Sequence, residues 1–208
     1  MPPFDALLLF FTSSILLALA PGPDNLFVMI QAAQRGRVAG LAVTLGLCTG
    51  LLFHTTAVAF GLAAVFKASA LAFNLLKYLG AGYLLYLAWG AFRAGDDGGG
   101  DSSAVDLPFA RLYRRGIIMN VTNPKVSIFF LAFLPQFADP QYGPLVPQMV
   151  LLGALFILAT ILIFGGISLL AGAFGARFRE SARAKRVLNW LAGSVFAGLA
   201  VKLAIAER

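Results

Sequence analysis

The chain has 208 residues, of which 60% are hydrophobic and 12% are charged, and its mean hydropathy is +0.85. Soluble domains are about 45–50% apolar and about one quarter charged, and disordered chains are more polar still, so this composition excludes both classes. The net charge of +7 does not indicate a nucleic acid partner, because no nucleic-acid-binding motif is present and membrane proteins collect Lys and Arg in the loops on one side. We expect one transmembrane domain over residues 1–208, surrounded by the lipid bilayer.

Six apolar stretches are long enough to cross about 30 Å of hydrocarbon as α-helices. They cover approximately Phe4–Gln34, Val38–Phe66, Leu71–Phe92, Gly116–Phe137, Val146–Phe174 and Val187–Ala206. The first stretch resembles the apolar core of a signal peptide, but no positive charge precedes it and Pro21 follows its small residues. We therefore expect it to be retained as the first span.

Positive charges gather in alternate loops. Eleven of the 16 Lys and Arg residues lie after the first, third and fifth spans: Arg35, Arg37, Arg93, Arg111, Arg114, Arg115, Arg177, Arg179, Arg183, Lys185 and Arg186. The opposite side holds only Lys67 and Arg208. The positive-inside rule predicts that the three basic loops face the cytoplasm and that both termini lie outside.

A polar, glycine-rich linker at residues 95–106 divides the chain into pseudo-repeats 1–94 and 107–208, each with three predicted spans. An odd number of spans in each half places the second half upside down relative to the first. The predicted fold class is therefore an all-α integral membrane fold, with six transmembrane helices arranged as two inverted three-helix repeats. Secondary transporters are often built in this way.

The first helix of each half is interrupted. Pro21, Gly22 and Pro23 break the first span, because proline lacks an amide hydrogen and clashes with the preceding turn. Pro124 breaks the fourth span early in its course. A matched pair of interrupted segments is the best sequence indication of a transporter's binding site, and we expect these four residues to act as hinges. The alternative is that each break is only a capped kink.

Polar residues at the breaks are suited to capping the half-helices that follow. Asp24 or Asn25 is expected to cap the first, and Thr122 or Asn123 the second, with Pro124 in the first turn. The N-terminus of a half-helix carries partial positive charge and attracts a carboxylate. We therefore include Asn25 and Asn123 among the candidates for substrate contact.

Three ionisable side chains are candidates for substrate binding or coupling. Asp24 is the only acidic residue in the interior of a predicted span, and it either carries a proton, pairs with a substrate ammonium or caps a helix. Lys125 either pairs with Asp24, holds a substrate carboxylate or extends to the membrane surface. His54 follows Gly46 and Gly50 on a small-residue helix face, where it either relays protons or forms a structural hydrogen bond.

Several motifs resemble the LysE/RhtB family of bacterial amino-acid exporters, in the family's order and over nearly the whole chain. They are Pro21-Gly-Pro-Asp-Asn-Leu-Phe-Val28, the Gly40 to Gly61 stretch with His54, Tyr83-Leu-Leu-Tyr-Leu-Ala-Trp-Gly90, Asn123-Pro-Lys125 and Phe133-Leu-Pro-Gln-Phe137. The resemblance implies export of amino acids across the inner membrane, driven by the proton motive force. It does not identify the substrate.

We therefore predict an exporter of amino acids or related small zwitterions that works by alternating access and proton antiport. Its expected partners are the substrate, protons and the lipid bilayer, and its glycine-rich faces pack either within the chain or against a second copy. We expect no cofactor or metal. The alternatives are a passive channel or an exporter of another solute. A membrane-embedded enzyme is disfavoured, because one His, one Cys and one intramembrane carboxylate make neither a catalytic triad nor a metal site.

Overall fold

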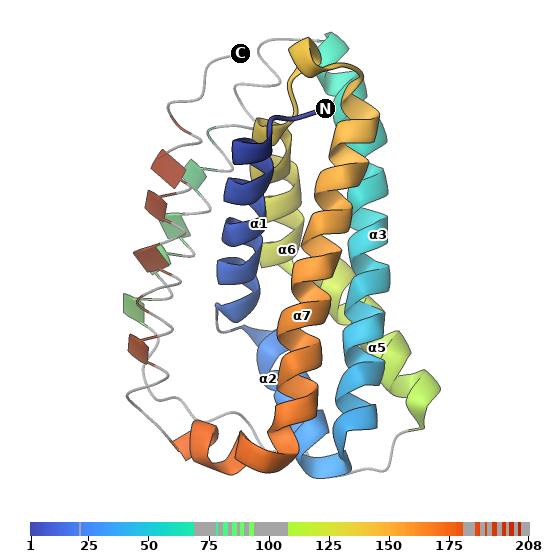
Figure 1. Cartoon of the computed structure of the whole chain (residues 1–208), viewed down its shortest axis with the longest axis vertical. Helices are drawn as coiled ribbons and strands as arrows, with labels where there is room; N and C mark the ends of the chain where they lie inside the picture. Colours follow the sequence, from blue (N-terminus) through green and yellow to red (C-terminus); the bar gives the residue numbers. More distant parts are fainter. Residues whose placement is uncertain are drawn as a thin grey trace.

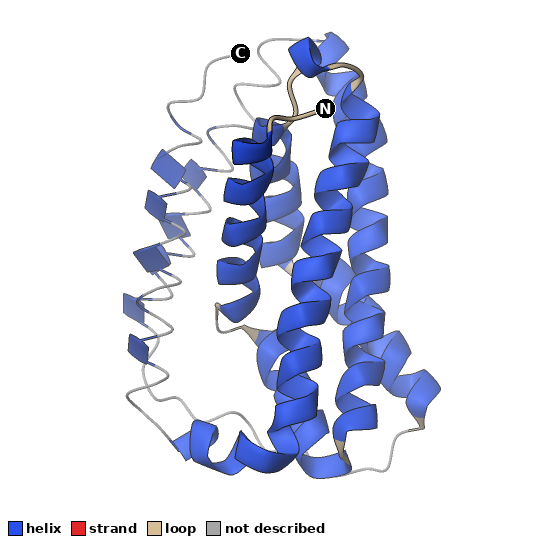
Figure 2. Cartoon of the chain, viewed as in Figure 1, coloured by secondary structure: helices blue, strands red, loops and turns tan. Residues whose placement is uncertain are grey.

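The structure is a computed structural model that describes residues 1–20, 22–68 and 108–180 continuously, and isolated residues between 78 and 93 and between 186 and 204. Every regular element in the continuous stretches is helical, as Figure 2 shows, which confirms the all-α class for this part of the chain. The third and sixth predicted spans lie outside these stretches, and the linker at 95–106 lies outside the described residues.

The first half begins with a bent pair of helices. α1 (Phe4–Leu19) and α2 (Pro23–Arg35) meet at an angle of 62°, and the chain then reverses into α3 (Arg37–Ala68). Gly36 makes this reversal with φ +83°, a left-handed conformation that favours glycine. In Figure 1, α1 lies in the upper half of the molecule and α2 in the lower half, while α3 runs along its whole length.

The second half contains another bent pair. α5 (Phe109–Thr122) is followed by α6 (Pro124–Ile128), the π-helix η1 (Phe129–Phe133) and the 3₁₀-helix η2 (Leu134–Phe137), with a bend of 52° at the break. A short 3₁₀-helix, η3 (Pro140–Tyr142), leads to the long helix α7 (Leu145–Glu180). Figure 1 shows α6 above α5, so both breaks fall near the middle of the molecule.

The apolar stretch predicted as the fourth span begins at about Gly116, and the helix that carries it, α5, begins seven residues earlier at Phe109. The basic residues predicted to lie in the loop, Arg111 among them, instead form its first turns. Arginine is a good helix former, so charge ends an apolar stretch without ending the helix. As a result the second break comes after 14 helical residues, close to the 16 that precede the first break.

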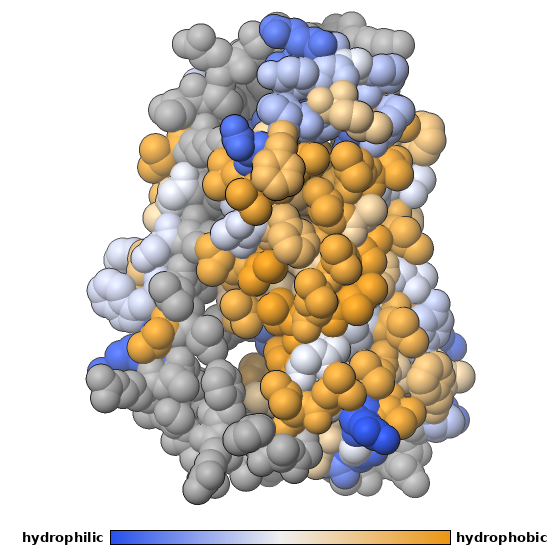
Figure 3. All heavy atoms as spheres, in the orientation of Figure 1, coloured by the Kyte–Doolittle hydropathy of each residue, from blue (hydrophilic) through white to orange (hydrophobic). Residues whose placement is uncertain are grey.

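The helices are long and apolar enough for a membrane. Arg37–Gly61 and Leu145–Leu170 qualify as single spans, and each bent pair qualifies jointly, which makes up to four candidate spans in the described part of the chain. Large apolar side chains such as Phe53, Phe60 and Leu162 are exposed on the outside of the bundle. In Figure 3 an apolar band crosses the middle of the visible face, with polar residues towards both ends. The chain is therefore a membrane protein.

Two apolar clusters pack between the described helices, and each joins segments from both halves of the chain. The first joins α1, the segment after the second break and α7 through Phe10, Phe129, Phe130, Phe133, Phe137 and Phe156. Their rings lie 4.7–6.2 Å apart from centre to centre. The second cluster joins α2, the start of α3, α5 and the later part of α7 through Val28, Val43, Leu47, Leu112 and Phe164. The polar breaks thus lie between two apolar regions.

Glycines bring α3 and α5 close together. A Cβ added at Gly46 would lie 2.1 Å from the carbonyl oxygen of Tyr113 and 3.0 Å from Cα of Gly116, and one at Gly50 would lie 2.6 Å from Cβ of Asn120. The small-residue face predicted from sequence therefore packs within the chain. Small residues let helix backbones approach closely, which strengthens packing where lipid surrounds the helices.

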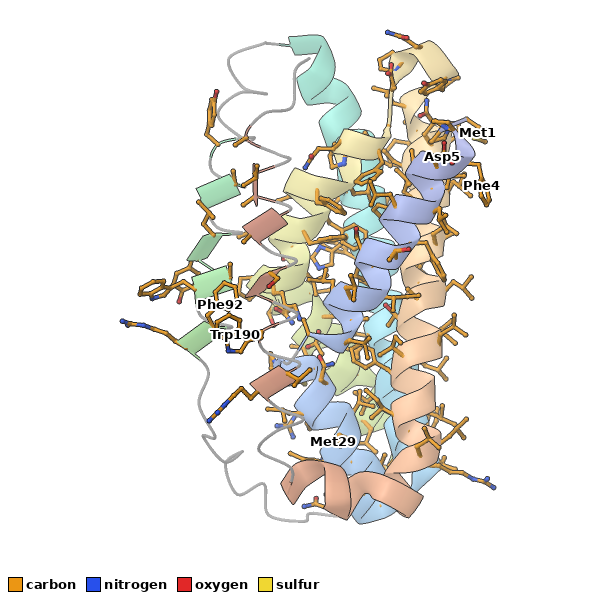
Figure 4. The ribbon with its side chains drawn as sticks, turned by 60° about the vertical axis from the view of Figure 1, so that its left-hand side comes forward. Met1, Phe4, Asp5, Met29, Phe92 and Trp190 are labelled. Carbon is orange, nitrogen blue, oxygen red and sulfur yellow. The ribbon has the colours of Figure 1, made fainter. Side chains whose placement is uncertain are left out.

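Isolated described residues of the third and sixth predicted spans also contact each other. The rings of Phe92 and Trp190 pack edge to face with their centres 5.2 Å apart. Figure 4 shows the two labelled side chains next to each other. Gly193 lies beside Phe92, and a Cβ at this glycine would come 2.6 Å from the Phe92 ring. The two segments therefore approach each other at these residues.

Candidate functional site

The first break lies between α1 and α2, where the structure describes Gly22 and Pro23, while Pro21 lies outside the described residues. Gly22 is the extended N-cap residue of α2 and forms no side-chain cap, and Pro23 occupies the first helical position, where its missing amide hydrogen costs nothing. The prediction that Asp24 or Asn25 caps α2 is wrong, since both lie inside the helix. Asn25 instead donates a 2.6 Å hydrogen bond from Nδ2 to the carbonyl oxygen of Ala18, so it ties α2 to the end of α1.

The second break has the predicted cap. Asn123 is the N-cap of α6, and its Oδ1 accepts a 3.0 Å hydrogen bond from the backbone nitrogen of Lys125. Pro124 takes the first helical position, as predicted. Thr122 is not the cap, because its hydroxyl donates to the carbonyl oxygen of Ile118 within α5. A hydroxyl that can reach a carbonyl one turn back is commonly used in this way.

The two breaks meet through Asn123 and Asp24. Nδ2 of Asn123 donates a 2.9 Å hydrogen bond to Oδ2 of Asp24 across a separation of 99 residues. Both side chains are buried, with exposed fractions of 5% and 7%. The Asn123 side chain thus has two functions, because its oxygen caps α6 while its nitrogen binds α2. The structure brings together the interrupted segments of the two halves.

Lys125 also takes part in this contact between the two breaks, which we call the junction. Its Nζ donates hydrogen bonds to the carbonyl oxygens of Leu17 and Ala20, at 3.1 and 3.0 Å. The last carbonyls of a helix carry partial negative charge, so an ammonium group stabilises the end of α1. The Lys125 ammonium and the Asp24 carboxylate also attract each other electrostatically. Lys125 therefore points into the break and does not extend to the membrane surface.

One oxygen of this junction is left over. Oδ1 of Asp24 is shielded from solvent and accepts no hydrogen bond from any residue that the structure describes. Leaving a buried polar atom unpaired costs about 1–3 kcal/mol, and more for a charged group. This buried oxygen can therefore either take up a proton or accept a hydrogen bond from an ammonium group.

His54 lies on α3 beside the end of α5. Its Nε2 is 3.2 Å from the carbonyl oxygen of Asn120, and because a carbonyl only accepts, Nε2 carries the hydrogen. The ring is buried and lies between Phe53 and Phe130, with ring centres 5.9 and 5.6 Å away. Its described hydrogen bond holds α3 against the second break, as expected of a structural histidine, while a relay role stays a prediction.

Residues 129–137 have a function in the site that the sequence reasoning missed. Their phenylalanines form the apolar cluster immediately after the second break, and Phe129, Phe130 and Phe133 have no exposed surface. The spacing of these phenylalanines by one, three and four residues is typical of the buried face of a helix, and this signal is visible in the sequence. The cluster seals the junction on that side with apolar rings.

Comparison with known proteins places the chain among membrane translocators. A sequence profile described as LysE type translocator matches residues 15–207. The homoserine/homoserine lactone efflux protein of Salmonella typhimurium (strain LT2) is 34% identical over 202 residues, which cover 94% of each chain. A protein of Vibrio cholerae described as an uncharacterized membrane protein is 32% identical over 200 residues, covering 96% of this chain and 97% of its own. No solved structure matches.

An apolar helical bundle with two interrupted helices joined by buried polar side chains is typical of a membrane transport protein. The chain belongs to the LysE type translocator family. Members of this family are transporters and not enzymes.

Proposed function

We propose that the chain exports amino acids or related small zwitterions across the bacterial inner membrane, by alternating access coupled to proton antiport. The observation that carries the proposal is the hydrogen bond between Asn123 and Asp24, next to the unpartnered Oδ1 of Asp24. A family of translocators and a relative named for homoserine efflux support the same substrate class.

In the proposed mechanism the junction binds the substrate and couples it to protons. Asp24 exchanges a proton or accepts the substrate ammonium through its free oxygen. Asn25 and Lys125 hold the two half-helices against the end of α1, and Asn123 joins α6 to Asp24 on α2. His54 anchors α3 to the end of α5. Substrate binding then competes with these internal contacts, which links occupancy to the arrangement of the helices.

The proposed movement takes place at the breaks. Pro21, Gly22, Pro23 and Pro124 form the hinges, because segments without continuous helical hydrogen bonds can change angle at low cost. We further propose six transmembrane helices in two inverted repeats, 1–94 and 107–208, with both termini in the periplasm. Support comes from the two bends of 62° and 52°, which follow helices of similar length.

Two measurements test the function. Cells expressing the chain should tolerate higher concentrations of toxic amino acids and analogues, homoserine included, than cells expressing an Asp24→Ala control. Inverted vesicles should accumulate the labelled substrate only while a proton gradient is present, and an uncoupler should abolish this accumulation. Equilibration without accumulation would instead show a passive channel. No movement of any amino acid in a broad panel would contradict the proposal.

A further inference from the structure

Four residues share the buried face of α2. Asp24, Val28, Gln31 and Arg35 are spaced by four, three and four residues, which places them on one side of a helix. The first three are buried, with exposed fractions of 7%, 0% and 3%, and Arg35 is half-buried. Gln34, which lies outside this face, is exposed.

Polar atoms on this face lack partners. Gln31 Oε1, Arg35 Nη1 and Asp24 Oδ1 are shielded from solvent, and none forms a hydrogen bond with any part of the chain that the structure describes. Buried polar groups in proteins are normally paired, and an unpaired one is unfavourable. Three on a single helix face therefore indicate a surface that a polar ligand or water contacts during the working cycle.

The face extends from the break to the basic end of the molecule. At a rise of 1.5 Å per residue, Asp24 and Arg35 are about 16 Å apart along α2, which is about half the hydrocarbon thickness. Figure 4 shows the labelled Met29 on α2 well below Met1, towards this end. Arg115 also lies near this stretch, with its guanidinium 4.8 Å from the centre of the Phe27 ring. By the positive-inside rule this end faces the cytoplasm.

The chemistry of the two outer residues matches a zwitterion. Arg35 offers a cationic donor and Gln31 an acceptor, and they are one helical turn, about 6 Å, apart. An α-amino acid carries its carboxylate and its ammonium on one carbon, so a donor and an acceptor on neighbouring turns of one helix face can bind both groups of the same molecule. Guanidinium groups bind carboxylates with particular strength, so Arg35 is suited to the carboxylate end.

Val28 separates these two residues from Asp24. It is fully buried in the second apolar cluster, together with Val43, Leu112 and Phe164. The polar face is therefore interrupted by an apolar contact between Gln31 and the junction. We propose that Gln31 and Arg35 form a cytoplasmic loading site for the zwitterionic substrate, distinct from the junction at Asp24. The inference rests on the proposed function and adds the place where substrate is first held.

The test compares a substrate that has a free carboxylate with one that lacks it. Homoserine and homoserine lactone share an ammonium group, but the lactone has no carboxylate. Uptake of both by inverted vesicles, whose outer surface is the cytoplasmic face, gives a half-saturating concentration for each. The variants are Arg35→Met and Gln31→Leu, with Arg37→Met and Gln34→Leu as controls of matching chemistry at exposed positions.

We expect Arg35→Met to raise the half-saturating concentration of homoserine about tenfold and that of the lactone less than twofold, because only homoserine loses a charged hydrogen bond. Gln31→Leu should raise both values, since both compounds keep the ammonium group. The two control variants should resemble the wild type, and immunoblotting of membranes verifies that all four are equally abundant.

The outcomes separate this inference from the proposed function. If the wild type transports neither compound, the proposed function fails for these substrates and the loading site fails with it. If the wild type transports both and Arg35→Met changes the two half-saturating concentrations equally or not at all, the loading site alone is overturned. An Arg35→Met protein too scarce to assay is replaced by Arg35→Lys, which keeps the charge but loses the guanidinium fork. This variant should still weaken homoserine more than the lactone, and an equal effect on both overturns the loading site.

Discussion

Nδ2 of Asn123 donates a 2.9 Å hydrogen bond to Oδ2 of Asp24, while Oδ1 of the same asparagine accepts from the backbone nitrogen of Lys125. One side chain therefore both starts α6 and holds a carboxylate on α2. Any rotation of α6 that moves its N-cap also moves the partner of Asp24. This link gives the two interrupted segments a direct mechanical connection.

Asp24→Asn separates ionisation from geometry. The asparagine Oδ1 can still accept from Asn123, so we expect normal abundance in the membrane. It carries no titrating proton, and a proton gradient should therefore no longer drive accumulation of labelled substrate in inverted vesicles, although exchange continues. Gradient-driven accumulation equal to that of the wild type would remove Asp24 from the coupling mechanism.

Lys125→Met removes the ammonium group that binds the end of α1. The carbonyl oxygens of Leu17 and Ala20 lose a charged partner, and hydrogen bonds to charged groups are worth about 1.5–3 kcal/mol. We expect thermal unfolding in detergent to occur several degrees lower and export to be lost. Lys125→Arg, which keeps a cationic donor, should recover part of the stability. An unchanged unfolding temperature in Lys125→Met would contradict the contact.

Replacing Pro21, Gly22 and Pro23 together with alanine should join α1 and α2 into one helix, because alanine restores helix propensity and the missing donors. We expect normal insertion and no export. Gly22→Ala alone is the control: at φ −169° the backbone is extended, and the new Cβ would lie an ordinary 3.5 Å from Nζ of Lys125. It should keep most of the activity. Full transport by the triple variant would show that the bend is not needed.

Gly46→Ala should destabilise the protein by separating α3 from α5. The added Cβ would lie 2.1 Å from the Tyr113 carbonyl oxygen, which belongs to the backbone and cannot rotate away. Overpacking of this kind costs roughly 1–3 kcal/mol, and we expect a clear fall in the temperature of thermal unfolding. Gly61→Ala has no described atom within 4 Å of its new Cβ and should unfold at or above the wild-type temperature. Equal behaviour of the two variants would refute the close packing.

The proposed orientation is tested by cysteine labelling in a Cys48→Ala background. Gln141 and Arg37 are both exposed. Arg37 is the first residue of α3 and Gln141 lies in η3, and these two positions are at opposite ends of the bundle. A cysteine at position 141 should react with a membrane-impermeant thiol reagent in intact cells. One at position 37 should react only after permeabilisation. The reverse pattern would invert the topology and with it the side assigned to the loading site.

Much of the fold could be predicted from local sequence. Apolar stretches predicted helices, and the prolines at 21, 23 and 124 predicted where they break, because both effects depend on neighbouring residues alone. The Asn123 cap was equally local. The start of α5 could not be placed from hydropathy, since a helix continues through Arg111 and its basic neighbours where the apolar stretch has ended.

The sequence by itself determined a helical membrane protein with two breaks and a short set of polar candidates beside them. Only the tertiary structure decided what those candidates touch: Asp24 turned to Asn123 instead of capping α2, and Lys125 turned to α1 instead of the membrane surface. The physical reason is that a buried polar group takes whichever partner the packing of distant helices provides. Here the packing is set by the glycine contact of α3 with α5 and by the phenylalanine cluster, so the partners come from a part of the chain about 100 residues away.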